Sequence, residues 1–516
     1  MIFKINNTLE DSSISTYKIL IKFILLSFAL VQIVISNFNL YVIFTVFLII
    51  FFTFLTIELF FNKKNLIFYF FPTLLIFSLN LVFLTGPLIF KTIFLQNINS
   101  NLDLPFFSYF IASMYQLTVN LAFLFYKKSN KFINLSKLIA NKIFKRMRLF
   151  EEPNIRYMIF IFFIVFINKY YLNFLDQGPT KTSEFGDVGF KILYKISLFY
   201  YLPLIFSFKF FFIDKKINNF TFYSIILFYI ASAFILSLGA NRRSDFYTMF
   251  LILFILISFY KLFLSNNFGS FSKVYILFFL VIIIFSNIFI SSNILKNRSD
   301  RASLKPKDLL LQSLDFSQPI NHRSKSVYEL YEQGMTFTDN EIIDRLIQIK
   351  FLDYNFRLAK NLSYKDAEEF TETVKGKYLG IFPQNFINIF SKNFKKKDYV
   401  VATGSMLEKA TYGRYLGGAL NVGSYLAELK VLFNSYFIIF IVVFILFLFT
   451  ITMVQSFQLN TDTEIIFAPI IFIISPHLFW LVASDTSGQF VYFFIRGAWE
   501  LVLLYYILFF LSKKNL

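Results

Sequence analysis

The sequence predicts an all-α membrane protein, a polytopic bundle of about 12 transmembrane helices with a large helical extracytoplasmic loop. Only 16% of the 516 residues are charged and 57% are hydrophobic, whereas a soluble domain carries roughly 25% charged residues. The apolar residues gather in blocks of about 18 to 25, the length that a helix needs to cross a hydrocarbon core of about 30 Å. The blocks are continuous and do not alternate with polar residues, which favours helices over barrel strands.

Twelve such blocks divide the chain into three parts. The first block lacks a small-residue cleavage site, so we expect it to remain as a helix rather than to be removed as a signal peptide. The parts are the first nine transmembrane helices with short loops (1–294), a large outer loop (295–431) and the last three transmembrane helices (432–516). The predicted spans lie near residues 19–36, 40–61, 66–90, 106–126, 156–175, 191–213, 220–240, 246–264, 274–294, 432–455, 465–484 and 489–511.

The placement of lysine and arginine predicts the orientation. The loop 127–153 holds eight basic residues against two glutamates, and pairs of lysines follow the second, sixth and twelfth spans. The loop 176–190, on the opposite side, holds three acidic residues against one lysine. Because basic residues accumulate in cytoplasmic loops, we expect both termini to be cytoplasmic. Anionic lipid headgroups beside these loops account for much of the net charge of +19 without a nucleic-acid partner.

The outer loop has the pattern of a folded cap over the membrane helices. Apolar residues recur at helical spacing within 339–362, and Ser363 with Asp366 resembles a capping box that opens a further helix. The stretch 392–418 is rich in lysine and glycine, and we expect it to be irregular.

Composition excludes several kinds of chemistry. The chain contains no cysteine, which excludes disulfides, thiolate zinc sites and cysteine nucleophiles. With two histidines, His322 and His477, a multi-histidine metal centre is not expected. We interpret both histidines as ordinary polar residues, and we predict neither a metal nor a cofactor.

Two arginines and an aspartate lie at the outer end of the seventh predicted span. Paired arginines at a helix end are commonly solvated, with their charged heads in water. Arginine is nevertheless disfavoured in short outer loops, so two in one turn indicate an anionic partner. We therefore predict catalytic roles for Arg242 and Arg243 and a substrate-binding role for Asp245.

The return of the outer loop into the membrane is a second candidate site. Four glycines occur within eleven residues from Gly413 to Gly423, so that backbone can approach a ligand closely. Arg414 can give two hydrogen bonds to a phosphate. Glu428 lies at the membrane boundary, where desolvation raises a carboxyl pKa toward that of a general base. Arg414 and Glu428 are predicted to be catalytic and Tyr425 to bind substrate; an ordinary capping segment with a structural ion pair is the alternative.

A third group of charges lies in or near the same outer half of the membrane. Arg496 is inside the last span, and Glu500 follows one turn later, so the pair could neutralise itself. Intramembrane charge still suggests function. We predict that Arg496 binds substrate together with a basic approach formed by Arg298, Arg301 and Arg323.

Together these residues describe an outward-facing cavity rimmed by arginines, with a carboxylate nearby. Such a site suits a lipid-linked diphosphate. Arginines can stabilise the negative charge that grows on a departing diphosphate, and the carboxylate can take a proton from an attacking sugar hydroxyl.

On these residues the chain resembles the O-antigen polymerases, the Wzy-type oligosaccharide repeat-unit polymerases. The segment from Gly239 to Ser244 is similar to that family's small-residue–arginine–serine turn, and the segment from Gly423 to Glu428 is similar to its membrane re-entry. Arg323 and Gly334 match an arginine–glycine spacing found in the family's loops. Many helices with a large late periplasmic loop are also typical of the family. Asn434 and Ser435 differ, because a glycine-rich turn is commoner there.

The resemblance implies metal-independent glycosyl transfer at the periplasmic face of a bacterial inner membrane. The growing glycan would pass from undecaprenyl diphosphate to the incoming repeat unit, giving O-antigen, capsule or exopolysaccharide. By position, Arg242 or Arg243 and Arg414 would hold the diphosphate, and Glu428 would be the base. The implied partners are the undecaprenyl-diphosphate-linked oligosaccharide, membrane lipids and a candidate chain-length regulator.

Three alternatives remain open. O-antigen ligases share this layout but usually carry a histidine in the re-entry segment, and 421–428 contains none. A flippase or transporter of lipid-linked oligosaccharides would suit twelve spans, but transporters usually show two similar halves and short loops. A structural or sensor role is the third alternative.

Overall fold

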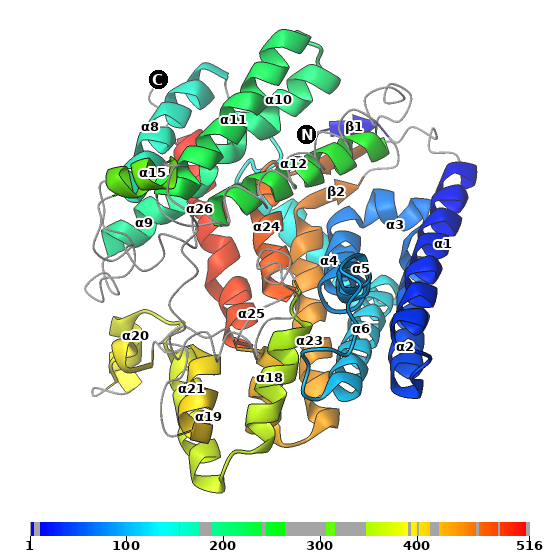
Figure 1. Ribbon diagram of the computed structural model, residues 1–516. Helices are drawn as coiled ribbons and strands as arrows, with labels where there is room; N and C mark the ends of the chain where they lie inside the picture. Colours follow the sequence, from blue (N-terminus) through cyan, green and yellow to red (C-terminus); the bar gives the residue numbers. More distant parts are fainter. Residues whose placement is uncertain are drawn as a thin grey trace.

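The computed structural model describes residues 2–4, 11–153, 155–174, 188–239, 244–263, 306–314, 347–390, 394–399, 402–412, 423–460, 464–482 and 486–511. Among these residues, nine helical segments are long and apolar enough to cross a membrane, so the chain is an all-α, multi-pass membrane protein (Figure 1). The nine match nine of the predicted spans. The predicted span 274–294 lies outside the described residues.

The first four candidate spans are built from the N-terminal helices. Asn39 begins α2, and its side chain accepts a hydrogen bond from the Tyr41 amide. A π-helical turn, η1, joins α4 to α5, so these elements form one membrane-crossing segment. The elements are α1 (Asp11–Ile35), α2 (Leu40–Phe60), α3 (Lys63–Phe68), α4 (Phe70–Asn80), η1 (Leu81–Thr85), α5 (Gly86–Ile93) and α6 (Pro105–Lys128).

The middle of the chain supplies three further candidate spans. The predicted span 156–175 corresponds to the 20-residue helix α8, in which Met158–Leu172 is the described apolar stretch. The elements are α7 (Asn130–Leu138), η2 (Ile139–Phe144), α8 (Ile155–Phe174), α9 (Val188–Ser197), η4 (Leu198–Tyr201), α10 (Leu202–Phe212), α11 (Asn219–Gly239), α12 (Ser244–Phe263) and α15 (Pro306–Leu314).

The outer loop contains a small helical cap, which lies at the lower end of the bundle in Figure 1. The predicted helix start at Ser363 is confirmed, because the Ser363 hydroxyl accepts a hydrogen bond from the Asp366 amide at 3.2 Å. Helical spacing within 339–362 is confirmed from residue 349 onward, and 339–346 lies outside the described residues. The cap elements are α18 (Ile349–Lys360), α19 (Tyr364–Leu379), α20 (Gln384–Phe390), η8 (Lys396–Tyr399) and α21 (Thr403–Tyr412).

The expectation that 392–418 is irregular was wrong for its central part, which forms η8 and α21. Local sequence gives a weak helix signal there, but tertiary packing compensates. Leu407 of α21 is buried in a small cluster with Leu358 of α18 and with Phe370 and Val374 of α19. The cap therefore has a core of its own.

The C-terminal part contains the last candidate spans and a three-stranded sheet that the sequence analysis did not predict. The antiparallel strands lie in the order β1–β3–β2, with Ile2 opposite Ile466 and Gln458 opposite Phe467. The elements are β1 (Ile2–Lys4), α22 (Tyr425–Phe433), α23 (Tyr436–Ser456), β2 (Gln458–Asn460), β3 (Glu464–Phe467), α24 (Ile471–Val482), α25 (Gly488–Tyr492), η9 (Phe493–Gly497), α26 (Ala498–Tyr506) and η10 (Ile507–Leu511).

The prediction of a single transmembrane helix over 465–484 was wrong. Its first residues belong to β3, whose side chains alternate between half-buried and buried. Pro469, which has no amide hydrogen to donate, separates the strand from the helix that begins at Ile471. The described part of that helix comprises 12 residues, Ile471–Val482.

The segments that connect the helices lie on two faces of the bundle, as their mutual contacts show. On one face, Lys127 donates to Asn65 at 2.7 Å, and Gln455 donates to the Phe68 carbonyl at 3.0 Å. The sheet joins the N-terminus to the segment after α23 on this face. On the other face, Asp353 of the cap accepts from the Leu104 amide. This grouping agrees with the prediction that successive connecting segments lie on alternate sides of the membrane.

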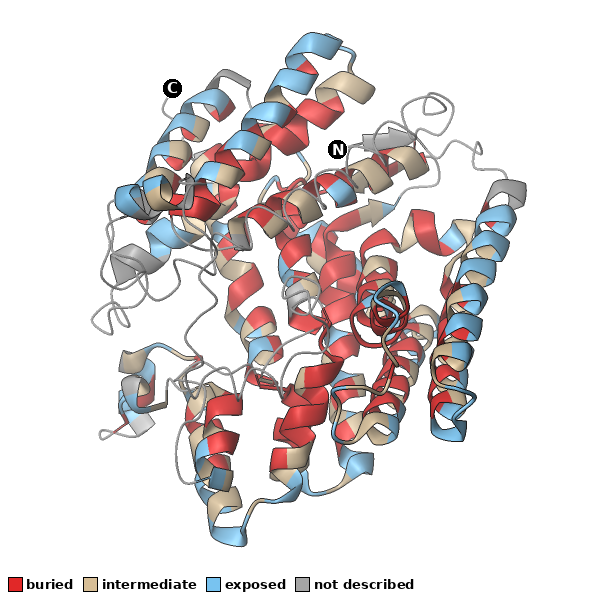
Figure 2. Cartoon of the chain, viewed as in Figure 1, coloured by how far each residue is buried: buried red, intermediate tan, exposed pale blue. Residues whose placement is uncertain are grey.

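Burial separates the interior of the bundle from its perimeter. Tyr109, Tyr115 and Phe123 of α6 are fully buried, and α6 packs closely against α2 and α23. The outward surfaces of α1 and α2 are exposed and apolar (Figure 2). A membrane protein needs this pattern because its perimeter contacts lipid chains rather than water.

Candidate functional site at the junction of the cap and the membrane helices

The short helix α22 carries a buried glutamate from the outer loop into the edge of the bundle. Ser424 lies just before the helix, and its carbonyl accepts a hydrogen bond from the Glu428 amide at 2.9 Å. Asn434 ends α22 in the left-handed conformation, with φ of 46°. Asparagine tolerates this conformation better than most residues. It can therefore make the turn into α23.

Glu428 is completely buried, and its contacts come from the residue that precedes α25. Its Oε1 atom accepts from the Ser487 amide at 3.2 Å and from the Ser487 hydroxyl. Among the described residues, Oε2 has no hydrogen-bond partner. Burying an incompletely bonded carboxyl group is costly, and Glu408 of α21 is a second described carboxylate with such an oxygen.

A tyrosine of the cap extends this contact into a chain of hydroxyl groups. The Tyr378 hydroxyl, at the end of α19, contacts the Ser487 hydroxyl. Since the single hydroxyl hydrogen of Ser487 is donated to Glu428, Tyr378 is the donor to Ser487. The chain Tyr378–Ser487–Glu428 therefore has a defined direction, with protons oriented toward the carboxylate.

Burial changes the acidity of both ends of this chain. It raises the pKa of Glu428 above the ordinary value for glutamate, against the opposing effects of the Ser487 and Thr486 hydroxyls and of the positive charge of Lys377. Burial also raises the pKa of Tyr378, to about 12, and the negative charge of Glu428 acts in the same direction. Tyr378 thus stays protonated at neutral pH, and Glu428 has the character of a proton acceptor.

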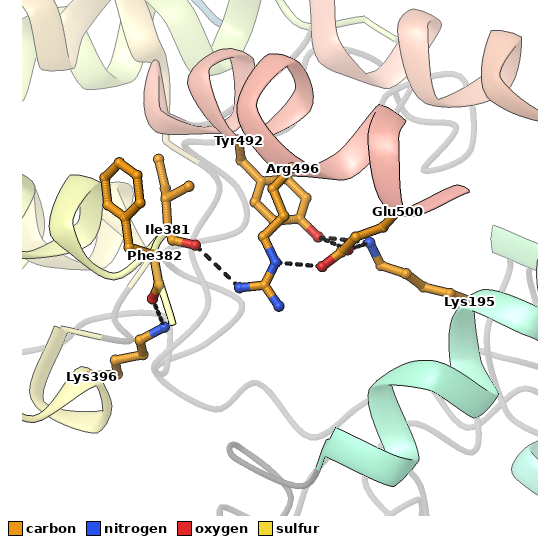
Figure 3. A network of polar contacts seen from close by, with 7 residues as sticks. All are labelled: Lys195, Ile381, Phe382, Lys396, Tyr492, Arg496 and Glu500. Carbon is orange, nitrogen blue, oxygen red and sulfur yellow. Dashed lines mark hydrogen bonds and ion pairs between the residues drawn. The ribbon is translucent and has the colours of Figure 1, made fainter. Parts of the chain in front are cut away.

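A second polar cluster lies further along the same C-terminal helical segment (Figure 3). Glu500 forms ion pairs with both Arg496 and Lys195, and Tyr492 donates to it at 3.1 Å. Arg496 also reaches the cap, where its Nη1 atom donates to the Ile381 carbonyl at 3.2 Å. Two cations face one carboxylate, so this cluster has an excess positive charge.

The two clusters share the same supporting elements. Ser487 and Arg496 are nine residues apart, which corresponds to about 14 Å along a helix. Tyr378 and Ile381, their partners in the cap, are three residues apart. The end of α19 therefore lies along the beginning of the last candidate span. A carboxylate and a net positive charge consequently face the same junction.

The other predicted site residues have different surroundings. Asp245 forms a largely buried ion pair with Lys169 of α8, and its backbone carbonyl accepts from Tyr201 at 3.2 Å. Tyr425 is buried, with its ring packed against those of Tyr115 and Phe490. Predicted residues that lie outside the described residues are Arg242, Arg243, Arg298, Arg301, His322, Arg323, Gly334 and Arg414.

Sequence reasoning did not select four residues of this junction. Lys195 carried a usable signal, because a lysine inside an apolar span suggests function. Ser487 and Tyr378 carried none, since a serine before a span and a tyrosine in a loop are common. Asp353, which binds the Asp103 and Leu104 amides, lies in a helix whose distant partners a sequence does not reveal.

The described residues offer donors for an anion rather than ligands for a metal. No three histidine, aspartate or glutamate side chains in this part of the chain gather closely enough to hold a metal ion. The arrangement can accept a proton at Glu428 and attract negative charge at Arg496 and Lys195.

The fold and this junction define a multi-pass membrane protein with a polar site under an extramembrane cap. Comparison with protein-family models, with curated proteins and with solved structures finds no match to the chain.

Proposed function

We propose that this protein is a membrane glycosyltransferase that polymerises lipid-linked oligosaccharide repeat units into a surface polysaccharide. The observation that carries the proposal is the buried Glu428 at the cap–membrane junction, which is joined to the Tyr378–Ser487 hydroxyl chain through one oxygen and has no partner among the described residues at the other. Burial raises the pKa of Glu428, which makes its carboxylate a better proton acceptor for a sugar hydroxyl. The resemblance of 239–244 and 423–428 to the O-antigen polymerases supports the same reading.

In this proposal the substrate is an undecaprenyl-diphosphate-linked oligosaccharide, and no metal takes part. Glu428 removes the proton from a hydroxyl group of the incoming repeat unit. The hydroxyl oxygen then forms a bond to the anomeric carbon of the growing glycan, while the bond from that carbon to the diphosphate oxygen breaks. The diphosphate leaves with the bonding electron pair. Arg242, Arg243 and Arg414 are assigned to stabilise its charge.

Arg496 and Lys195 add positive charge to the same side of the junction. Their shared partner Glu500 neutralises only one of the two cations, so a diphosphate near this cluster gains electrostatic stabilisation. Arg298, Arg301 and Arg323 are assigned to the approach of the substrate. The orientation belongs to the proposal as well: the basic face is cytoplasmic, both termini lie there, and the cap is periplasmic.

The test replaces Glu428 by glutamine in the full-length protein. E428Q keeps the shape of the side chain but removes its ability to accept a proton, so elongation of purified lipid-linked repeat units in detergent should fall by about 10²- to 10⁴-fold. Glu408 provides a matched control. It is also fully buried, one oxygen accepts from the Tyr354 hydroxyl at 2.8 Å, and the other has no partner among the described residues.

The two variants together decide the assignment. E408Q should elongate within a few-fold of the unmodified protein. If E428Q elongates as well as E408Q, Glu428 is not the base. The detergent assay also separates the polymerase from a flippase, since lengthening of the glycan requires no movement across a membrane. A ligase would transfer the glycan to a lipid acceptor other than the lipid-linked repeat unit.

A further inference from the structure

A pocket of about 320 Å³ lies on the face of the bundle opposite the cap, between α1, the end of α2 and the start of α3. Lysines 18, 22 and 63 line it together with Glu58, and Ile19 and Phe61 add apolar surface. The Tyr378–Glu428 junction belongs to the other face, so this pocket is independent of the proposed catalytic site.

The charges of the pocket suit an anion with several oxygens. Lys18 and Lys22 are one helical turn apart on α1, and both contact the Glu58 carboxylate, Lys18 at 3.0 Å. Lys18 and Lys22 together carry one positive charge more than the single carboxylate that they share. Each ammonium group has three N–H donors. Lys18 and Lys22 can therefore bind a phosphate while keeping their contacts with Glu58.

The pocket continues into a lipid-facing surface. Ile19, which lines the pocket, is 66% exposed, and Phe23 and Leu30 further along α1 are 67% and 64% exposed. With Leu26 and Val34, which are also exposed, they recur every three or four residues and form one stripe. The opposite side of α1 packs against α2 and α5, and α1 lies at the edge of the bundle (Figure 2).

We propose that this pocket binds the phosphate headgroup of an anionic phospholipid, whose acyl chains lie along the apolar stripe of α1. Basic pockets between transmembrane helices bind lipid headgroups in this manner. Inorganic phosphate has the same charged chemistry, but it has no acyl chains to contact the apolar stripe of α1. The lipid is therefore the occupant that the whole surface fits.

The experiment is native mass spectrometry of the full-length protein in detergent. The protein is titrated with phosphatidylglycerol and, separately, with phosphatidylcholine of the same acyl chains. The unmodified protein should retain phosphatidylglycerol with a preference of about tenfold or more, because each lysine near an anionic headgroup contributes on the order of fivefold. K18Q/K22Q should lose this preference. K131Q/K137Q, which removes two exposed lysines from the same basic face, should keep it.

A variant that removes the negative charge of the pocket makes the test independent of folding defects, because it is expected to strengthen binding rather than weaken it. E58Q removes the carboxylate that competes for Lys18 and Lys22, so it should strengthen phosphatidylglycerol binding. Three outcomes would overturn the proposal. K18Q/K22Q could retain as much phosphatidylglycerol as the unmodified protein, both double variants could lose the preference equally, or E58Q could bind phosphatidylglycerol more weakly. Displacement of the lipid by millimolar inorganic phosphate would also overturn it, because the acyl chains would then contribute nothing.

Discussion

Two buried carboxylates connect the cap to the membrane helices, and their surroundings differ in one decisive respect. Asp353 of α18 has both oxygens occupied: Oδ2 accepts from the Asp103 amide at 2.6 Å, and Oδ1 accepts from the Leu104 amide at 2.8 Å and the Ser108 hydroxyl at 2.7 Å. Glu428 of α22 has one oxygen bonded and one without a partner among the described residues.

This difference separates a structural role from a chemical one. The donors around Asp353 belong to the start of α6, where unpaired amides and the helix dipole favour a negative charge. Asp353 therefore caps α6 from a distance and fixes α18 against the bundle. Burial raises the pKa of both carboxyl groups, but of the two only Glu428 has an oxygen without a hydrogen-bond partner among the described residues.

The largest expected effect on stability comes from removing the aspartate. D353A leaves three donors in the junction without their acceptor, so the free energy of unfolding should fall by about 2–4 kcal/mol. Thermal unfolding in detergent measures the loss, and limited proteolysis shows whether the cap detaches first.

For Glu428, in contrast to Asp353, we expect substitution to have little effect on the free energy of unfolding. E428Q replaces a buried ionisable group by a neutral one of the same shape, and its unfolding free energy should stay within about 1 kcal/mol of the unmodified protein. If E428Q destabilises the protein as much as D353A does, the two carboxylates have the same structural role and the comparison fails.

A second prediction concerns pH. Glu428 accepts a proton only when ionised, so elongation should fall as pH decreases through its pKa, which burial raises. The Ser487 hydroxyl opposes this increase. S487A should therefore raise the pKa of Glu428 further and move the acid limb of the pH–rate profile to higher pH. Losing this charge-assisted hydrogen bond should also cost about 1.5–3 kcal/mol of stability.

The pH profile of kcat/KM for elongation tests this prediction. Ser475 of α24 serves as the control, because it is also buried and, within the described part of the chain, its hydroxyl donates to the Phe472 carbonyl of its own helix at 3.0 Å. S475A should leave the acid limb in place. An unchanged or lower acid limb in S487A would remove Glu428 from the rate-determining proton transfer.

The membrane helices were predictable because hydrocarbon imposes one simple requirement, a long run of apolar residues. Nine predicted spans correspond to candidate spans of the structure. The error at 465–484 has a long-range cause. Ile465 and Ile466 are as apolar as a span requires, yet their backbone pairs with two other strands. One of these strands, Ile2–Lys4, is more than 450 residues away in sequence, and such pairing has no local signal.

The candidate site was predictable only in part. Glu428 was selected because it lies where the outer loop meets the membrane, and it is fully buried there. The partners of Glu428 were not selected, since Ser487 and Tyr378 come from segments 59 and 50 residues away in opposite directions. Arg496 was predicted to bind substrate, with pairing to Glu500 left open as the alternative, and the ion pair is present. The third member, Lys195, joins them only through folding.

The smallest expected effect tests the outer end of the hydroxyl chain. Y378F removes the donor to Ser487 but leaves the Ser487–Glu428 contact, so stability should fall by about 0.5–1.5 kcal/mol. Elongation should decrease by no more than about tenfold, the equivalent of 1.4 kcal/mol. Y354F is the matched control, because Tyr354 donates to the other buried glutamate, Glu408. A similar loss of stability in both variants, with slower elongation only in Y378F, would place the chain of hydroxyls in the reaction. Equal elongation by both variants would confine Tyr378 to holding the cap against the membrane helices.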